Sequence, residues 1–180
     1  TQDDAQILFI DTPGIHKPKH KLGEYMVKAA ENTLKEVDVI LFVVDATENI
    51  GAGELYIMER LQSTQAPVIL VVNKVDQINK QQVLPVISRY SDKLNFVGAI
   101  PISAKEKTNL DQLVEEIKKY LEEGPQYYPS DMITDQPERL VIGELIREKA
   151  LHLTKEEIPH AIAVDIEEIS KRNNDDLYIR

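Results

Sequence analysis

The chain of 180 residues contains no cysteine and no tryptophan, and only seven glycines and three phenylalanines. Without cysteine it can form neither disulfides nor thiolate metal sites, which is consistent with a reducing compartment. Its longest apolar runs have the length of strands, so no segment is predicted to cross a bilayer. No signal peptide is recognisable from Thr1 onward.

Positive charge is also scarce, because 21 Lys and Arg stand against 31 Asp and Glu, a net charge of -10. A chain this acidic repels phosphates, so nucleic-acid binding would need a local basic surface. Residues 16–21, HKPKHK, form the one basic cluster. This cluster is either a solvated loop or a contact with RNA or a protein partner.

Four segments share one pattern, in which an apolar run is followed at once by a polar residue suited to a turn. The segments are 5–14, 37–46, 66–76 and 96–105, and the polar residues are Asp11, Asp45, Asn73 and Ser103. Continuous apolar runs are typical of strands covered on both faces, as in a parallel sheet. Stretches of helical period follow at 22–37, 53–63, 81–94 and 110–123, with Asn109 as the predicted N-cap of the last.

This alternation of strand and helix predicts an open α/β sheet with right-handed crossovers. Ligands of such sheets bind beyond the carboxyl ends of the strands. A single polar residue after a strand is usually just a solvated loop residue. Because the pattern recurs four times, we predict that these residues share one ligand-binding edge.

The composition changes after residue 122, where three prolines and one glycine fall within 123–137. We therefore predict a first domain at 1–122, a linker at 123–137 and the start of a second domain at 138–180. In the second domain, residues 139–153 have a helical apolar face, and 158–169 alternate like a half-buried strand. A further strand is predicted to begin near the end of the chain.

Asn73, Lys74 and Asp76 form an Asn-Lys-x-Asp motif directly after a core strand. Guanine presents an N1–H and an N2–H₂ side by side, and one carboxylate can accept both hydrogen bonds. Adenine offers no such pair of donors. The position of Asp76 therefore predicts guanine recognition, with Asn73 holding the loop and the far edge of the base, and the Lys74 stem lying over the ring.

Two further motifs gain meaning from their order along the chain. At a strand end, Asp11 is suited to hold Mg²⁺ through water, and the N–H of Gly14 is free to approach a terminal phosphate. The second motif, Ser103-Ala104-Lys105, would present backbone N–H groups to the guanine O6. The motifs are Asp11-Thr12-Pro13-Gly14 and Ser103-Ala104-Lys105.

These motifs, together with the long segment DQPERLVIGELIREKALHLTKEEIPHAIAVDIEEI, resemble the Era family of GTPases of ribosome assembly. The resemblance implies a P-loop GTPase-type, mainly parallel sheet flanked by helices, followed by part of an α+β KH-like RNA-binding domain. It implies GTP or GDP with Mg²⁺ as ligands, and 16S rRNA and the 30S subunit as partners. It further implies a cytoplasmic monomer with peripheral association with the cell membrane.

The chain departs from the pattern of such GTPases in several places. It contains no G-x-x-x-x-G-K-[ST] phosphate loop and no Gly-x-x-Gly RNA clamp, and we cannot place a first switch threonine. Ile15 stands where many GTPases carry a catalytic glutamine, so no catalytic residue is assigned. We expect a piece of a longer protein, which on its own binds GTP poorly.

Two other functions remain open from the sequence. One is a related GTPase whose second domain binds protein instead of RNA. The other is a binding fragment that has lost its nucleotide chemistry and acts only on RNA or as a scaffold. An upstream Gly-Lys-Ser or Gly-Lys-Thr loop would exclude the inactive fragment, and a downstream Gly-x-x-Gly with flanking lysines would indicate RNA.

Overall fold

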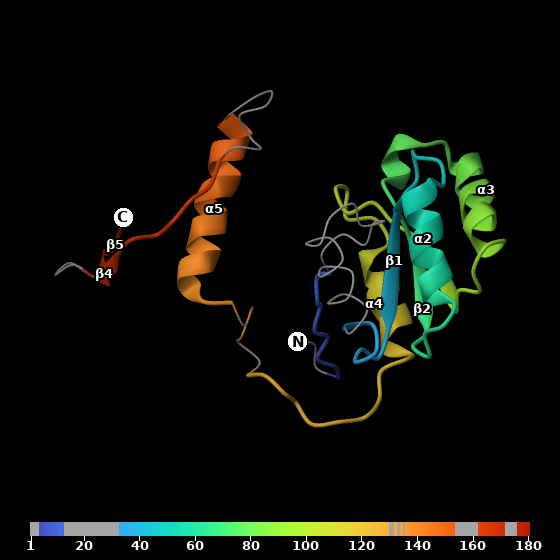
Figure 1. The fold of residues 1–180 in the computed structure, drawn as a ribbon, viewed down its shortest axis with the longest axis horizontal. Coiled ribbons are helices and arrows are strands. Elements are labelled where there is room, and N and C mark those ends of the chain that lie inside the picture. The colour runs from blue at the N-terminus through green and yellow to red at the C-terminus, as the bar shows by residue number, and fades with distance from the viewer. Residues whose placement is uncertain are drawn as a thin grey trace. The chain divides into compact units, whose positions relative to one another are not determined.

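The computed structural model describes residues 4–12, 33–129, 132, 134, 136–153, 162–171 and 176–180. The chain divides into two compact units, Thr1–Gln126 and Tyr127–Arg180, and residues 121–129 around the division carry no helix or strand (Figure 1). The division falls inside the segment for which the sequence predicts a linker.

Among its described residues, the first unit has three parallel strands, in the order β1-β2-β3. They are β1 (Ile40–Asp45), β2 (Val68–Asn73) and β3 (Gly98–Pro101). In the register of the sheet Asp45 pairs with Asn73, so β1 and β2 end side by side. Three of the four strands predicted from apolar runs are therefore confirmed, and they are parallel as expected.

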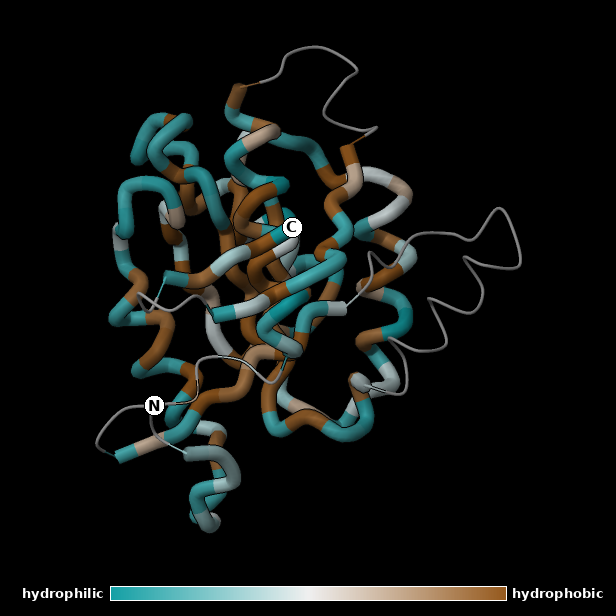
Figure 2. Tube along the Cα trace, turned by 90° about the vertical axis from the view of Figure 1, so that its left-hand side faces the viewer, coloured by the Kyte–Doolittle hydropathy of each residue, from teal (hydrophilic) through white to brown (hydrophobic). Residues whose placement is uncertain are grey.

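Helices cover both faces of this sheet (Figure 1). The helices are α2 (Ala52–Leu61), α3 (Lys80–Ser91) and α4 (Leu110–Lys118). One core cluster combines Leu70 of β2 with residues of α2 and α3, whereas a second combines Ile69 of β2 with Ile117 of α4. Figure 2 shows hydrophobic and hydrophilic stretches alternating along the trace. Burial on both faces explains the unbroken apolar run of β2.

The expected strand at 5–11 is wrong, because residues 4–12 carry no strand. The side chain of Ile7 instead packs with the cluster on the α4 side of the sheet. Asp4 accepts two hydrogen bonds from Lys118 Nζ, at 2.9 and 3.1 Å. A strand needs a neighbouring backbone to pair with, and within the described residues no backbone ladder forms beside this segment.

The helix that follows β3 begins where the sequence predicts, with Asn109 at the N-cap position. Its side chain does not cap the helix, however, because Asn109 Nδ2 donates to the carbonyl of Pro101 at 2.8 Å. The sequence predicts that this helix extends to residue 123, but it ends at Lys118. Just beyond it, the N–H groups of Lys119, Tyr120 and Leu121 each donate to the carbonyl three residues earlier, a 3₁₀ pattern that is common at helix ends.

The second unit contains α5 (Glu138–Leu153), β4 (Ile169–Lys171) and β5 (Leu177–Ile179). The helix matches its prediction, and β4 and β5 pair antiparallel. The strand expected at 158–169 is wrong for 162–168, which lack strand structure although Ile162, Val164 and Ile166 are more buried than their neighbours. In the described part of the chain, no helix is both long and apolar enough to span a membrane.

Gly143 is the buried residue of α5, and it faces the segment 162–168. A Cβ at this position would lie 3.6 Å from the Val164 carbonyl oxygen and 3.7 Å from Ile166 Cγ1, an ordinary contact. We therefore expect Gly143→Ala to stabilise the helix by up to about 1 kcal/mol. Gly143→Leu has no room and should displace the segment.

Amide hydrogen exchange at Glu167 and Glu168, whose N–H groups donate to the Arg180 carbonyl at 2.7 and 3.2 Å, measures the outcome. Protection should persist in Gly143→Ala and fall in Gly143→Leu. Equal protection in both variants would mean that α5 does not pack on this segment in solution.

Candidate nucleotide-binding edge

Polar residues gather at the carboxyl ends of the three strands. Asp45 and Asn73 end two neighbouring strands and face each other in the register. Ser103 follows β3 after one further residue, whose N–H donates to the Val72 carbonyl at 2.8 Å. The edge predicted from the recurring pattern is thus formed by three of its four polar residues.

The side chain of Asn73 joins the two loops that leave this edge. Its Oδ1 accepts from the N–H of Lys74 at 2.8 Å and from the N–H of Ala104 at 3.0 Å. A backbone bond from Val75 N–H to the Ile102 carbonyl, at 3.2 Å, lies beside it. Asn73 therefore fixes the loop after β2 against the loop after β3.

Asp76 and Ser103 form the second link between these loops. The Ser103 hydroxyl donates to Asp76 Oδ1 at 2.5 Å and accepts from the N–H of Glu106 at 3.1 Å. Ser103 is almost fully buried, whereas Asp76 is exposed. The buried Ser103 hydroxyl therefore fixes the orientation of the Asp76 carboxylate, which remains accessible to hydrogen-bond donors of a ligand.

The backbone of these loops is strained. Lys74, Lys107 and Asn109 have φ values of 64°, 54° and 58°, and they are the non-glycine residues with positive φ in the described chain. Left-handed backbone is costly for residues with a Cβ and collects at functional sites, where the surroundings enforce it. All three lie in the loops that leave this edge.

Asp45 holds the ammonium of Lys74. Asp45 Oδ2 lies 2.5 Å from Lys74 Nζ, and Oδ1 accepts from both the N–H and the hydroxyl of Thr47, at 2.8 and 2.7 Å. The bond from Lys74, followed by those from Thr47, lowers the pKa of Asp45 to about 2. The same contact raises the pKa of Lys74.

The lowered pKa has a testable consequence. Asp45 has an ordinary pKa of 3.8, so its pairing stabilises the fold above that pH and is lost as the pH falls toward about 2. The carboxyl ¹³C signal of Asp45 should titrate near pH 2 and shift upward in Lys74→Met, which removes the ammonium. An unchanged midpoint in that variant would show that Lys74 does not hold Asp45 in solution.

The other predicted site residues that the structure describes do not join the hydrogen-bonded network of Asn73, Asp76 and Ser103 through their side chains. Lys105 is exposed, and its Nζ lies 4.0 Å from Glu106 Oε1. Asp11 and Thr12 follow a segment without strand structure, and no hydrogen bond or ion pair joins them to the edge in the described chain. Pro13, Gly14 and Ile15 lie outside the described residues.

Sequence reasoning placed Asp45 at the edge but gave it no role, and it did not single out Thr47. The sequence could have suggested that Asp45 lies near the loop after Asn73, because the ends of two neighbouring parallel strands lie opposite each other. Only the register and the direction of the Lys74 side chain turn that proximity into an ion pair.

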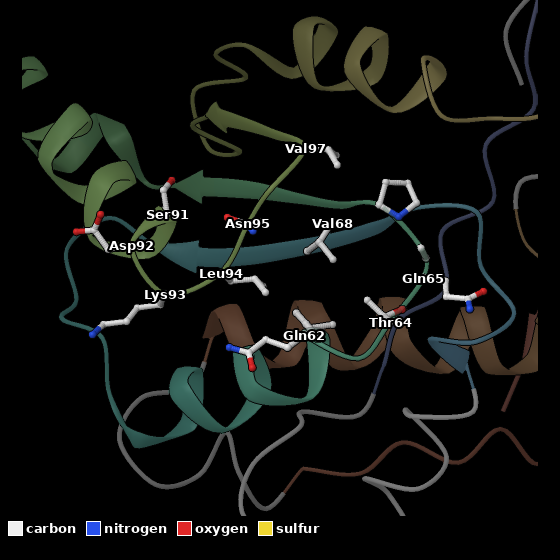
Figure 3. Close-up of a pocket in the computed structure, with 13 residues that line it drawn as sticks. Gln62, Thr64, Gln65, Val68, Ser91, Asp92, Lys93, Leu94, Asn95 and Val97 are labelled. Carbon is white, nitrogen blue, oxygen red and sulfur yellow. The ribbon is translucent and has the colours of Figure 1, made fainter.

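A cavity of about 450 Å³ lies elsewhere in the first unit, near the start of β2. It is lined by the segment after α2, by Val68 and by residues 91–95 and 97, and Figure 3 shows polar Gln62, Thr64 and Asn95 on its wall. None of the predicted site residues lines it. The cavity is therefore not the nucleotide site inferred from the sequence.

Comparison with known proteins agrees with these features. The elongation factor Tu GTP-binding domain family matches residues 1–123. A variant of Aquifex aeolicus Era bound to GDP and AlF₄⁻ is 45% identical with a TM-score of 0.87, and the match covers 99% of this chain and 62% of that chain. Era in complex with MgGDPNP and nucleotides 1506–1542 of 16S ribosomal RNA is 45% identical with a TM-score of 0.82, over 94% and 58%.

The translation elongation factor SelB from Methanococcus maripaludis shares only the fold. It is 22% identical with a TM-score of 0.53, and the match covers 68% of this chain and 26% of that chain. The chain spans about 60% of the length of the Era chains that it matches. The parallel sheet covered by helices is the fold that these matches share. The chain therefore belongs to the family of the elongation factor Tu GTP-binding domain, and the resemblance to Era inferred from its motifs is confirmed.

Proposed function

We propose that the protein carrying this chain is a GTP-binding and GTP-hydrolysing switch protein that acts in small ribosomal subunit assembly by binding 16S rRNA. The observation that carries this proposal is the Asn73–Asp76–Ser103 network at the strand-end edge. Era chains 45% identical to this one are bound to GDP with AlF₄⁻ in one structure, and to MgGDPNP and 16S ribosomal RNA in another.

Each residue of the network has a chemical role in guanine recognition. The exposed carboxylate of Asp76 would accept from guanine N1–H and N2–H₂, a bidentate and charge-assisted pair. Asn73 would keep the two loops at a fixed spacing, and the Lys74 stem would cover one face of the ring. The backbone N–H groups of Ala104 and Lys105 would lie near O6, although Ala104 N–H already donates to Asn73.

Mg²⁺ would accompany the nucleotide, and the described residues are compatible with it. Among them no group of three or more His, Asp or Glu side chains could form a metal cage. Mg²⁺ bound to a nucleotide keeps several waters and uses one or two carboxylates, so the exposed Asp11 could hold it through water. The ion would neutralise phosphate charge, and Thr12, Pro13 and Gly14 would lie along the phosphates.

For the second unit, we propose the beginning of a KH-like RNA-binding domain. The support is the long resemblance to Era over residues 135–169 and the presence of a helix followed by an antiparallel strand pair. We further propose a cytoplasmic monomer with peripheral contact to the cell membrane, which rests on the resemblance alone.

The deciding experiment uses the intact protein. Isothermal titration should show GTP and GDP binding with Mg²⁺ and no measurable ATP binding, and GTP should be hydrolysed. A 16S rRNA fragment should bind more tightly with a non-hydrolysable GTP analogue than with GDP. Equal binding of GTP and ATP would refute guanine recognition, whereas GTP binding without RNA binding would favour a protein partner.

The chain of 180 residues alone should bind GTP poorly, because it has no G-x-x-x-x-G-K-[ST] loop to hold the phosphates. Titration of this chain beside the intact protein measures the difference. Micromolar affinity of the chain for GTP would show that the base-binding loops suffice without that loop.

A further inference from the structure

We propose that Asp45 is a positioning residue for guanine-nucleotide binding, acting through Lys74. Asp45 itself would not touch the nucleotide. It would hold the Lys74 side chain extended beside the end of the sheet, in the place where its stem meets the purine ring. This inference rests on the proposed guanine-nucleotide function of the same edge.

The first support is that the two oxygens of Asp45 have separate tasks. Oδ1 takes both hydrogen bonds from Thr47, which fixes the rotamer of the carboxylate. Oδ2 is thereby directed to Lys74 Nζ at 2.5 Å. A carboxylate fixed in this way offers the ammonium one position, whereas a freely rotating one would offer many.

The second support is the location of the pair between two strand ends. Asp45 and Asn73 are partners in the register, and Ala46 N–H donates to the Asn73 carbonyl at 2.9 Å. Lys74 is the next residue along the chain, and its left-handed backbone turns the chain out of the sheet. The ion pair thus crosses the point at which the guanine-binding loop begins.

The third support is that Lys74 needs an anchor. Its side chain is 51% exposed, compared with 23% for Asp45, so solvent would otherwise leave the lysine free to sample many rotamers. Immobilising one such side chain at a binding site costs about 0.5 to 1.5 kcal/mol, equivalent to about two- to tenfold in affinity. If Asp45 orders Lys74 beforehand, nucleotide binding no longer bears this cost.

The first measurement needs no nucleotide. Competitive acetylation of the 180-residue chain, read by mass spectrometry, should label Lys74 slowly and several times faster in Asp45→Asn, because the pair protects the protonated amine. Asp38→Asn, which removes an exposed carboxylate just before the same strand, should leave the rate unchanged. Equal labelling of Lys74 in wild type and Asp45→Asn would overturn the proposal.

The second measurement uses GTP and the intact protein. Asp45→Asn should raise the Kd for GTP about three- to tenfold, and Asp45→Glu should restore much of the loss. The preference for GTP over ITP should stay unchanged, because Asp76 carries it. A loss of that preference would mean that Asp45 acts on the base edge directly and would overturn the positioning role.

A double-mutant cycle separates positioning from a general structural effect. Lys74→Met keeps the apolar stem without the ammonium, so adding Asp45→Asn to it should change the Kd no further. Additive losses would overturn the proposal, because Asp45 would then act without Lys74. If the wild-type intact protein binds no GTP, the proposed function fails, and the acetylation rates alone decide whether Asp45 orders Lys74.

Discussion

Asp76→Asn in the intact protein should weaken GTP binding by about 2 to 4 kcal/mol, or about 30- to 1,000-fold. The substitution replaces one carboxylate oxygen by an NH₂ group, which would face the N–H donors of guanine. In the wild type the Ser103 hydroxyl donates to Asp76 Oδ1, and in the variant it can still donate to the remaining carbonyl oxygen. The fold should therefore survive, and the loss should appear in binding alone.

Xanthine nucleotides provide the matched test of this substitution. Xanthine has a carbonyl at the 2-position and can accept from the new NH₂ group, so XTP should bind Asp76→Asn better than GTP does. Asp92→Asn, at the exposed C-terminal end of α3, removes a carboxylate distant from the edge and should change neither affinity. Unchanged GTP affinity in Asp76→Asn would end the assignment of this loop to guanine.

Asn73→Ala should have the second largest effect, because it affects both loops at once. The N–H groups of Lys74 and Ala104 both donate to Asn73 Oδ1 and would lose their acceptor. Ala104 is exposed, so water can replace part of the loss, and we expect the free energy of unfolding to fall by only about 1 to 2 kcal/mol. GTP affinity should fall about ten- to 100-fold, because Asp76 and Ala104 no longer keep their spacing.

Urea denaturation and nucleotide titration of the same preparations separate the two effects. Asn95→Ala serves as the control, because Asn95 is exposed and lines the cavity near the other end of β2. A loss of stability without a loss of affinity would show that Asn73 is only a structural residue. A loss of affinity that XTP shares equally would confirm that Asn73 orders the loops and does not select the base.

The sequence predicted the sheet well where burial on both faces leaves an unmistakable apolar run. The run of β2 is of this kind, and its strand ends at Asn73 as expected. The segment 5–11 carries the same signal, but its residues form no strand here. Apolar composition records that a segment can be buried, whereas strand formation also requires a backbone partner at the right distance.

The same limit applies to the second unit. Alternation at Ile162, Val164 and Ile166 predicted their deeper burial correctly, yet no strand forms at these residues. The segment instead lies against α5, where the Val164 carbonyl and the Ile166 side chain face Gly143. A period of two indicates which side chains turn inward, and it does not indicate whether a helix or a strand lies on the other side.

For the candidate site, spacing along the chain singled out Asn73, Asp76 and Ser103, and the structure brings these three together. It did not give the role of Asp45, because that role depends on where a flexible lysine side chain ends. Nor does the N-cap preference of asparagine predict that Asn109 donates to the carbonyl of Pro101. Such contacts depend on the tertiary distance between loops, which a local pattern does not contain.

The uneven distribution of apolar burial between the two units affects how the chain denatures. In the described residues, the unit after Gln126 buries one large aliphatic side chain, Ile166, whereas both large clusters belong to the unit before it. Units with such different cores do not melt as one cooperative system. A single melting temperature for this chain would therefore average two transitions, and the first to melt would be the one that contains α5.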